Sequence, residues 1–309
     1  MQFVLLLIKY AMKKILFALP FLLFACHKDH EEEASYVSSP TVDNTDTVIA
    51  PLPAVPAPDH IIFVWFENKD YTQVIGSPEA PYINSLISHG TLFVDFHALG
   101  HPSYPEYIAF FSGTTNNKQD DHCIEGAPYS NLNLFTQLSA KGKTFAWYSE
   151  DLPEAGSDVC YHEDYVERHN PTQCFSNVSL KANKRWLDFP ADLNKLETVV
   201  CISPNLANDM HNGTIREGDD WLRTNCSQLI RWCEDHNAVF VIYFDENNNM
   251  PGNRIPVIAV GQPVKANYTD STYYDHYNWT RTLLSMYGAA PIGNSASRKD
   301  ITGCWTDLN

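Results

Sequence analysis

The sequence predicts an α/β fold, a three-layer α/β/α sandwich with a mostly parallel central sheet. Six short segments are rich in β-branched and aromatic residues, and several are apolar on both faces, as strands of a covered parallel sheet are. Three segments with helical spacing lie between these strands and have Gly or His near their ends. This alternation indicates a parallel sheet covered by helices. The expected strands cover residues 60–66, 91–99, 143–149, 197–203, 238–244 and 255–261, and the expected helices cover residues 81–90, 131–142 and 219–236.

The first 25 residues have the layout of an export signal. Lysines precede an apolar run that is too short to span a bilayer comfortably. The run ends in LFAC (23–26), which resembles the lipobox of bacterial lipoproteins, so we expect a signal peptide over residues 1–25 and lipidation of Cys26. A plain cleaved signal is the alternative, and either Met1 or Met12 could be the start. Both interpretations predict export, as an outer-membrane or cell-surface lipoprotein or otherwise to the periplasm or the medium.

Residues 26–58 are expected to form a tether. A charged run, HKDHEEE, is followed by a stretch rich in Ser, Thr, Pro and Asp that ends in PLPAVPAP, a composition that favours extended chain. The acidic run resembles surface-export signals of some outer-membrane lipoproteins, and a solvated spacer is the alternative. Residues 59–309 remain, enough for one sizeable core and thus one domain.

The chain is strongly acidic. Its formal net charge is −16, and loss of the three lysines of the leader, which has no acid, makes it −19. Such a surface repels nucleic acids and anionic membranes. We therefore expect no nucleic-acid partner and no membrane contact beyond a lipid anchor at Cys26. An anionic substrate would require a cation within the site.

Eight cysteines in an exported chain suggest disulfides, but seven remain when Cys26 is set aside. Cys226 and Cys233 lie in an expected helix, roughly 10 Å apart along its axis, which is too far for a bridge between them. Each is expected to need a partner elsewhere, which the sequence does not name.

Polar side chains follow four of the expected strands. They are Glu67 and Asn68, His101 and Ser103, Asp209 and His211, and Asp245 and Glu246. Ligands of parallel sheets bind at the carboxyl ends of the strands, so this pattern predicts a single site. One such pair alone would be ordinary turn chemistry. Glu67 and Asn68 can reach one point only if the chain turns between them, because neighbours on a strand face opposite ways.

Three carboxylates and one amide at one point would repel each other unless a cation lies among them. The oxygen atoms of Glu67, Asn68, Asp245 and Glu246 suit a hard divalent ion. Such an ion would polarise a phosphoryl oxygen and lower the pKa of a coordinated hydroxyl.

Ser103 has two compatible interpretations. With Glu106 it forms the SxxE pattern of a capping box, and Pro105 lies in the first turn, where a missing N–H costs nothing. At the start of a helix, Ser103 could also be a nucleophile beside N–H groups that hold an anion. His211 and His276 have plainer alternatives too, a surface loop histidine and a buried, satisfied one.

Five segments, in order along residues 59–288, match motifs of a known family. ENKDYTQVIG (67–76) is similar to ENxxFxxxxG, and HPSYPEYIAFFSG (101–113) is similar to PSxPNYxxxxSG. The others are SPNLANDMH (203–211) with GDDWL (218–222), FDEN (244–247) and YDHYNWTRTLLSMYG (274–288). The chain thus resembles the acid phosphatase and phospholipase C phosphoesterase family of the alkaline phosphatase-like superfamily, whose α/β/α sandwich agrees with the predicted fold.

The resemblance assigns roles to the polar residues. It implies Ser103 as the nucleophile and a metal ligand, together with the metal ligands Glu67, Asn68, Asp245 and Glu246. It implies a catalytic or phosphate-binding role for Asp209, His211 and His276, with a second metal as the alternative. Substrate contacts are expected for His101, Asn205 and Asn208.

Two features depart from the family pattern. Glu106 stands where the family has Asn, and an acid there would repel a phosphate unless it faces away, as the capping box would arrange. Residues 151–193, which include Cys160 and Cys174, match no motif and are expected to shape the pocket.

These observations predict a metal-dependent acid phosphatase that hydrolyses phosphomonoesters through a phosphoserine, with a histidine protonating the leaving oxygen. The expected substrate is a phosphorylated small molecule, and the expected cofactor is a divalent ion, with Ca, Mg, Mn and Zn all open. One alternative is a phosphodiesterase or phospholipase C activity in the same site. Another is a catalytically silent surface lipoprotein that holds glycans with its Tyr and Trp side chains.

Overall fold

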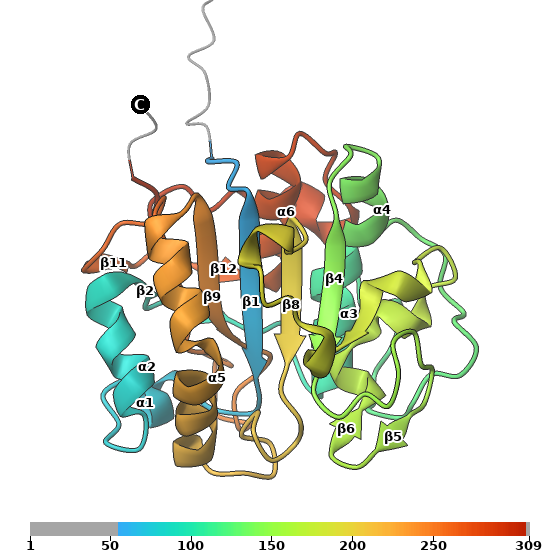
Figure 1. The fold of residues 1–309 in the computed structure, drawn as a ribbon, viewed down its shortest axis with the longest axis horizontal. Helices are drawn as coiled ribbons and strands as arrows, with labels where there is room; N and C mark the ends of the chain where they lie inside the picture. The colour runs from blue at the N-terminus through green and yellow to red at the C-terminus, as the bar shows by residue number, and fades with distance from the viewer. Residues whose placement is uncertain (1–54, 307–309) are drawn as a thin grey trace, which may run out of the picture. The chain divides into compact units, whose positions relative to one another are not determined.

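The computed structural model describes residues 55–306 (Figure 1). The predicted signal peptide (1–25) and most of the predicted tether (26–58) lie outside the described residues. Within the described part, no helix is both long and apolar enough to span a membrane.

The central sheet has eight strands in the order β11-β2-β10-β9-β1-β8-β4-β7. Neighbouring strands are parallel except where β10 pairs antiparallel with β2 and β9, so the predicted mostly parallel α/β sheet is confirmed. The strands are β1 (His60–Phe66), β2 (Gly90–Phe93), β4 (Phe145–Ser149), β7 (Asn183–Arg185), β8 (Val199–Ser203), β9 (Ala238–Phe244), β10 (Val257–Val260) and β11 (Tyr268–Asp270). Two small sheets pair β3 (Phe96–His97) with β12 (Tyr274–Asp275) and β5 (Tyr161–His162) with β6 (Tyr165–Val166).

Helices cover both faces of the sheet. Figure 1 shows α2 and α5 in front of it and α3 and α6 behind it. The α-helices are α1 (Tyr71–Val74), α2 (Pro81–Ser85), α3 (Ser103–Ser112), α4 (Leu134–Ser139), α5 (Ile215–Asp235) and α6 (His276–Met286). Short 3-10 helices cover Leu86–His89, Glu167–His169, Pro171–Cys174, Leu180–Ala182, Trp186–Asp188, Leu193–Lys195 and Gly293–Ser297.

An aromatic core joins the middle strands to the helices behind them. Trp65 of β1 stacks on Tyr107 of α3, with ring centroids 4.5 Å apart, and meets Tyr243 of β9 edge-on. Phe63 meets Trp279 of α6 edge-on at 5.2 Å. These rings are fully buried, and each contributes a large apolar area and a defined packing geometry. The core therefore fixes α3 and α6 relative to the ends of β1 and β9.

Three sequence predictions need correction. The expected strand 91–99 is two strands in different sheets, β2 and β3, because the chain leaves the main sheet after Phe93. The helix expected from residue 219 begins at Ile215, where Thr214 and Glu217 form a capping box. Cys226 and Cys233 need no partners elsewhere, since both are buried free thiols that behave as small apolar side chains.

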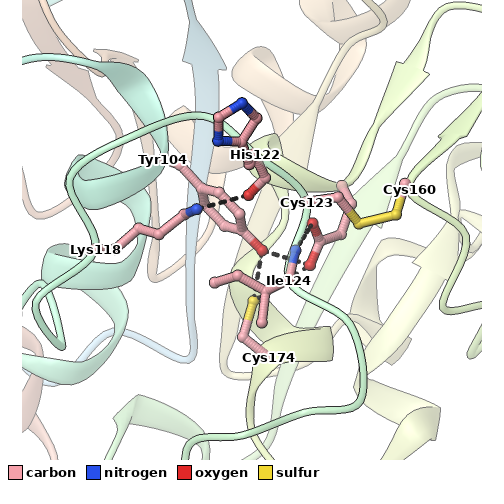
Figure 2. The surroundings of a disulfide bond; sticks show 8 residues. Tyr104, Lys118, His122, Cys123, Ile124, Cys160 and Cys174 are labelled. Carbon is pink, nitrogen blue, oxygen red and sulfur yellow. Dashed lines mark hydrogen bonds between the residues drawn. A yellow bond between two sulfur atoms is a disulfide. The ribbon is translucent and has the colours of Figure 1, made fainter.

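One disulfide, Cys123–Cys160, is present in the described part of the chain, with a sequence separation of 37 residues. It joins the loop after α3 to the segment 151–193. Figure 2 shows it beside Tyr104 and Cys174. The crosslink adds a covalent tie to two irregular segments that are otherwise joined by short β-bridges of Pro128 and Tyr129 to Phe175.

Gly113 ends α3 in the left-handed conformation, with φ +73°. A Cβ there would lie 2.3 Å from the Ile292 carbonyl oxygen, so Gly113→Ala combines backbone strain with a backbone clash. Gly142 has a similar φ of +69° but open space around a Cβ, which makes Gly142→Ala a matched control. We expect a loss of about 1 kcal/mol of unfolding free energy for Gly142→Ala and at least about 2 kcal/mol more for Gly113→Ala. Urea unfolding measures both, and equal losses would contradict the clash.

Candidate active site

The site lies at the carboxyl ends of β1, β8 and β9. Phe66 and Phe244 are register partners, so the next residues, Glu67 and Asp245, leave the sheet side by side. The Glu67 N–H donates to the Asp209 carbonyl at 2.8 Å, which brings the loop after β8 to the same point. Parallel pairing therefore places acids from three distant segments together.

A left-handed residue turns the chain after β1, as the sequence required. Asn68 has φ +55°, a conformation that asparagine tolerates. Its backbone N–H donates to Asp245 Oδ1 at 3.1 Å, and its side-chain amide donates to Glu67 Oε2 at 3.0 Å. The turn thus keeps both Glu67 and Asn68 at the site.

Ser103 lies among these acids. Its Oγ is 3.0 Å from Glu67 Oε2 and 3.3 Å from Glu246 Oε1, and the residue is buried. The predicted capping box is wrong, because Pro102 is the N-cap of α3 and no side-chain cap bond is present there. The N–H of Tyr104 already donates to Asp121 Oδ1 at 3.0 Å, so one first-turn donor expected for an anion is occupied.

Glu106 is held by contacts with Leu99 and His276 and not by a capping box. Its Oε2 accepts from the Leu99 N–H at 2.7 Å and lies 3.2 Å from His276 Nε2. His276 is fully buried; its Nε2 also lies 2.6 Å from the Asp245 carbonyl oxygen, and its Nδ1 contacts the Tyr243 hydroxyl. Burial opposes the charged imidazole, but the hydrogen bond and charge of Glu106 outweigh it and raise the pKa of His276. His276 therefore holds the strand end that carries Asp245.

A second cluster adjoins the first. His169 lies between two acids, with Nε2 3.3 Å from Glu67 Oε1 and Nδ1 3.0 Å from Asp209 Oδ2. These three buried residues place ligand atoms within 4.8 Å of one another, a spacing that could hold a metal ion. The Tyr107 hydroxyl donates to Glu67, and its ring stacks on His169. The N–H of His211 donates to Asp209 Oδ1 at 2.8 Å.

Burial of so many acids shifts their titration. Burial raises the pKa of Asp245 to about 6 and, with the charges of Asp245 and Glu106, the pKa of Glu246 to about 10. Burial, followed by the charges of Asp245 and Asp209, also raises the pKa of Glu67. Burial thus disfavours the charged carboxylates unless a positive charge compensates them.

Two observations fit a cation at this place. Asp245 Oδ2 is buried and lacks a hydrogen-bond partner within residues 55–306. Burial lowers the pKa of His169, and a neutral imidazole has a single N–H. His169 can therefore donate to only one of its two carboxylate neighbours, Glu67 or Asp209. At the other contact the bare ring nitrogen faces a carboxylate oxygen, and a proton or a cation between the two atoms would remove their repulsion. Glu67, Asn68, Ser103, Asp245 and Glu246 could supply one ion with oxygen ligands, and Glu67, His169 and Asp209 a second.

The remaining predicted residues lie at different distances from the acids. His101 Nδ1 is 2.7 Å from Glu246 Oε2. The side-chain amides of Asn205 and Asn208 instead donate to Asp151 at 2.6 Å and Glu150 at 2.9 Å. Their contact with substrate stays a prediction, and it would require these amides to leave their carboxylate partners.

Sequence reasoning missed three residues of the site. Tyr107 and His169 contact Glu67, and Arg168 Nη2 lies 3.3 Å from His211 Nε2. Arg168 and His169 come from the segment 151–193, which was expected to shape the pocket but offered no motif. Tyr107 was in view, four residues after Ser103 on the same face of a helix, and that spacing could have indicated it.

The fold is an α/β/α sandwich of the alkaline phosphatase type, and the family model and the relatives below make the protein a hydrolase of phosphoric esters. The model of the Phosphoesterase family matches residues 64–290, and the chain belongs to that family. This confirms the resemblance seen in the sequence.

Curated relatives agree with this assignment. The chain is 35% identical over 257 residues to the phosphatidylinositol-3-phosphatase of Mycobacterium tuberculosis, covering 82% of this chain and 85% of that protein. It is 30% identical to a probable acid phosphatase of Kluyveromyces lactis, covering 74% of this chain and 58% of that protein. An alkaline phosphatase superfamily protein of Vibrio parahaemolyticus shares the fold, with TM-score 0.55, 13% identity and coverage of 80% and 71% of the two chains.

Glu106→Ala should destabilise the folded protein, because Glu106 supports Leu99 and His276 beside the site. The change leaves the Leu99 N–H and His276 without their buried acceptor, so we expect a loss of about 2–4 kcal/mol in unfolding free energy. Glu106→Gln keeps an oxygen for Leu99 and should lose about half as much. Urea unfolding compares the two variants, and a loss below about 0.5 kcal/mol for Glu106→Ala would contradict this role.

Proposed function

We propose that the protein is a metal-dependent phosphatase that hydrolyses phosphomonoesters through a phosphoserine at Ser103. The observation that carries the proposal is the position of Ser103 Oγ, 3.0 Å from Glu67 and 3.3 Å from Glu246, at the start of α3. A lone helix-capping serine has no reason to be buried among carboxylates from two other segments.

The chain's own residues account for the first half of the reaction. The hydroxyl of Ser103 attacks phosphorus in line, its proton passes toward Glu67, and the bond from phosphorus to the leaving oxygen breaks. Asn68 and Tyr107 hold Glu67 in place by donating to its two oxygens. A divalent ion held by Glu67, Asn68, Ser103, Asp245 and Glu246 would lower the pKa of the serine hydroxyl and neutralise charge on the phosphoryl group.

His211 is the better placed of the two predicted histidines for the leaving oxygen. It is half-buried on a loop, whereas both ring nitrogens of His276 are occupied inside the core. We assign proton transfer at the leaving oxygen to His211: its neutral Nε2 takes the proton that a monoester monoanion brings and passes it to the leaving oxygen, while His276 supports Asp245. Water then hydrolyses the phosphoserine, and the same histidine can take up the proton of that water.

The substrate class follows from the relatives and from charge. The relatives include a phosphatidylinositol-3-phosphatase and an acid phosphatase, and such names support phosphomonoesters as the substrate class. The acidic chain favours small, soluble esters over anionic membrane surfaces. A phosphorylated inositol headgroup is one candidate substrate. In an activity assay it would be supplied on a short-chain, soluble lipid.

Ser103→Ala should reduce turnover of an aryl phosphate by at least about a thousandfold, because the attacking oxygen is lost. Ser139→Ala, the same change on an exposed residue of α4, should leave turnover unchanged. Steady-state kinetics on the metal-loaded protein measure this loss, and acid quenching followed by mass spectrometry should find phosphate on Ser103 of the wild type. Retained turnover in Ser103→Ala would refute the mechanism.

A divalent ion should stabilise the chelator-treated protein. Binding to the folded state alone raises the unfolding free energy by about 2.7 kcal/mol when the free ion is at 100 times its Kd. Asp245→Asn keeps the acceptor for the Asn68 N–H but removes a charge, so the ion should raise the unfolding free energy less in this variant. Asp235→Asn, on the exposed end of α5, is the control and should not alter the effect of the ion. Thermal melts with and without Ca²⁺, Mg²⁺, Mn²⁺ or Zn²⁺ provide the readout. Identical rises in all three proteins would mean that the ion binds elsewhere.

A further inference from the structure

Basic side chains stand out at a site built from acids. Lys69 is half-buried, and its Nζ donates to the Met210 carbonyl at 2.7 Å. Arg168 is also half-buried and lies beside His211. A phosphomonoester approaches this site carrying up to two negative charges of its own. A fixed cation that faces the phosphoryl group would offset the repulsion from the buried acids.

The contact between Arg168 and His211 determines the state of both side chains. A guanidinium only donates, so His211 Nε2, 3.3 Å from Arg168 Nη2, is the acceptor of a neutral imidazole. The proton of that imidazole is on Nδ1, which donates to Asn212 Oδ1 at 2.9 Å.

Most of the donor capacity of Arg168 is unused. The bond to His211 is the one hydrogen bond of its guanidinium within residues 55–306, and the buried Nε has no partner there. Five donors in a planar fork match two oxygens of a phosphoryl group better than a lysine ammonium does. The arrangement is therefore that of an anion receptor.

We propose that Arg168 is a specificity-determining residue that binds the phosphoryl group and favours monoesters over diesters. The inference rests on the proposed function. A monoester offers three nonbridging oxygens and up to two charges, whereas a diester offers two oxygens and one charge. A guanidinium facing that group gains more from the monoester, because the monoester carries the larger charge and keeps a further oxygen free when two accept from the fork.

Both neighbours of Arg168 in the sequence are buried and fixed. His169 is held between Glu67 and Asp209. Glu167 accepts a hydrogen bond from the hydroxyl of Tyr104, the residue after Ser103, and its Oε2 accepts from the Ile124 N–H at 3.2 Å. These contacts tie the backbone of Arg168 to the first turn of α3 and to the site.

The disulfide braces the same segment from outside. The N–H of Glu167 donates to the Cys160 carbonyl at 2.9 Å, and Cys160 is bonded to Cys123, which precedes Ile124. Figure 2 shows the crosslink alongside Tyr104, Ile124 and Cys174. The guanidinium is thus preorganised, because the loop that carries it loses little freedom when substrate binds.

The main experiment compares Arg168→Met and Arg168→Lys with wild type on an aryl phosphate and a bis-aryl phosphate. For Arg168→Met we expect kcat/KM on the monoester to fall about 10- to 100-fold, the worth of a hydrogen bond to a charged group. On the diester it should fall less than about threefold. Arg168→Lys keeps the charge and should lie between wild type and Arg168→Met on the monoester.

A matched control shows whether the effect belongs to this position. Arg185→Met makes the same change on the same segment, at a side chain paired with Asp188 at 2.8 Å, and should alter neither substrate. If Arg168→Met does not fold, Arg168→Lys carries the comparison. An equal fall on both esters, or no fall, would overturn the role of Arg168. If the wild type shows no turnover, or if its turnover does not depend on Ser103, the proposed function itself is refuted.

The contribution of the Cys123–Cys160 disulfide to the position of Arg168 can be tested separately. The double variant Cys123→Ala/Cys160→Ala should raise the KM for the monoester several-fold while kcat stays within about threefold, because positioning of the phosphate is lost and the attacking group is not. Treating oxidised wild type with a mild reductant should give the same split. An unchanged KM in both tests would show that the disulfide does not position Arg168.

Discussion

Mutual repulsion among buried carboxylates is the constraint on which this structure depends. Glu67, Asp209, Asp245 and Glu246 are almost completely buried, and each has a pKa raised by burial. Such a group of acids costs free energy in every state in which it is charged and uncompensated. The surrounding donors and the single N–H of a neutral His169 compensate only part of this charge, which fits the proposed binding of a cation. A bound cation would also serve the phosphatase chemistry that we propose.

The sheet makes this cluster possible, because pairing of backbone groups sets where the side chains go. Register between β1 and β9 forces Glu67 and Asp245 together, whatever their charges. Aromatic packing of Trp65, Tyr107 and Tyr243 then fixes α3 against the same strand ends. The free energy that holds the acids together therefore comes from the aromatic core and from the backbone hydrogen bonds between strands. The repulsion among the acids acts against it.

The segment 151–193 adds what the sandwich does not provide. It contributes His169 to the acids and places Arg168 beside His211. The segment has little regular structure, so its position depends on side-chain hydrogen bonds of Glu167 and on the link to Cys123. The proposed function thus rests on a rigid sheet edge and on an irregular segment that a disulfide joins to the loop after α3.

The sequence by itself determined the α/β class, most strand positions, the family and the residues that follow the strands, since hydrophobic periodicity and motif order are local properties. It could not determine that residues 91–99 divide between two sheets, that Pro102 and not Ser103 caps α3, or that Glu106 turns to His276. Those outcomes depend on contacts between residues far apart in the chain. Only the tertiary structure brought His169 and Arg168 to the site and paired Cys123 with Cys160, because neither the loop after α3 nor the segment 151–193 has a periodicity from which a position could be inferred.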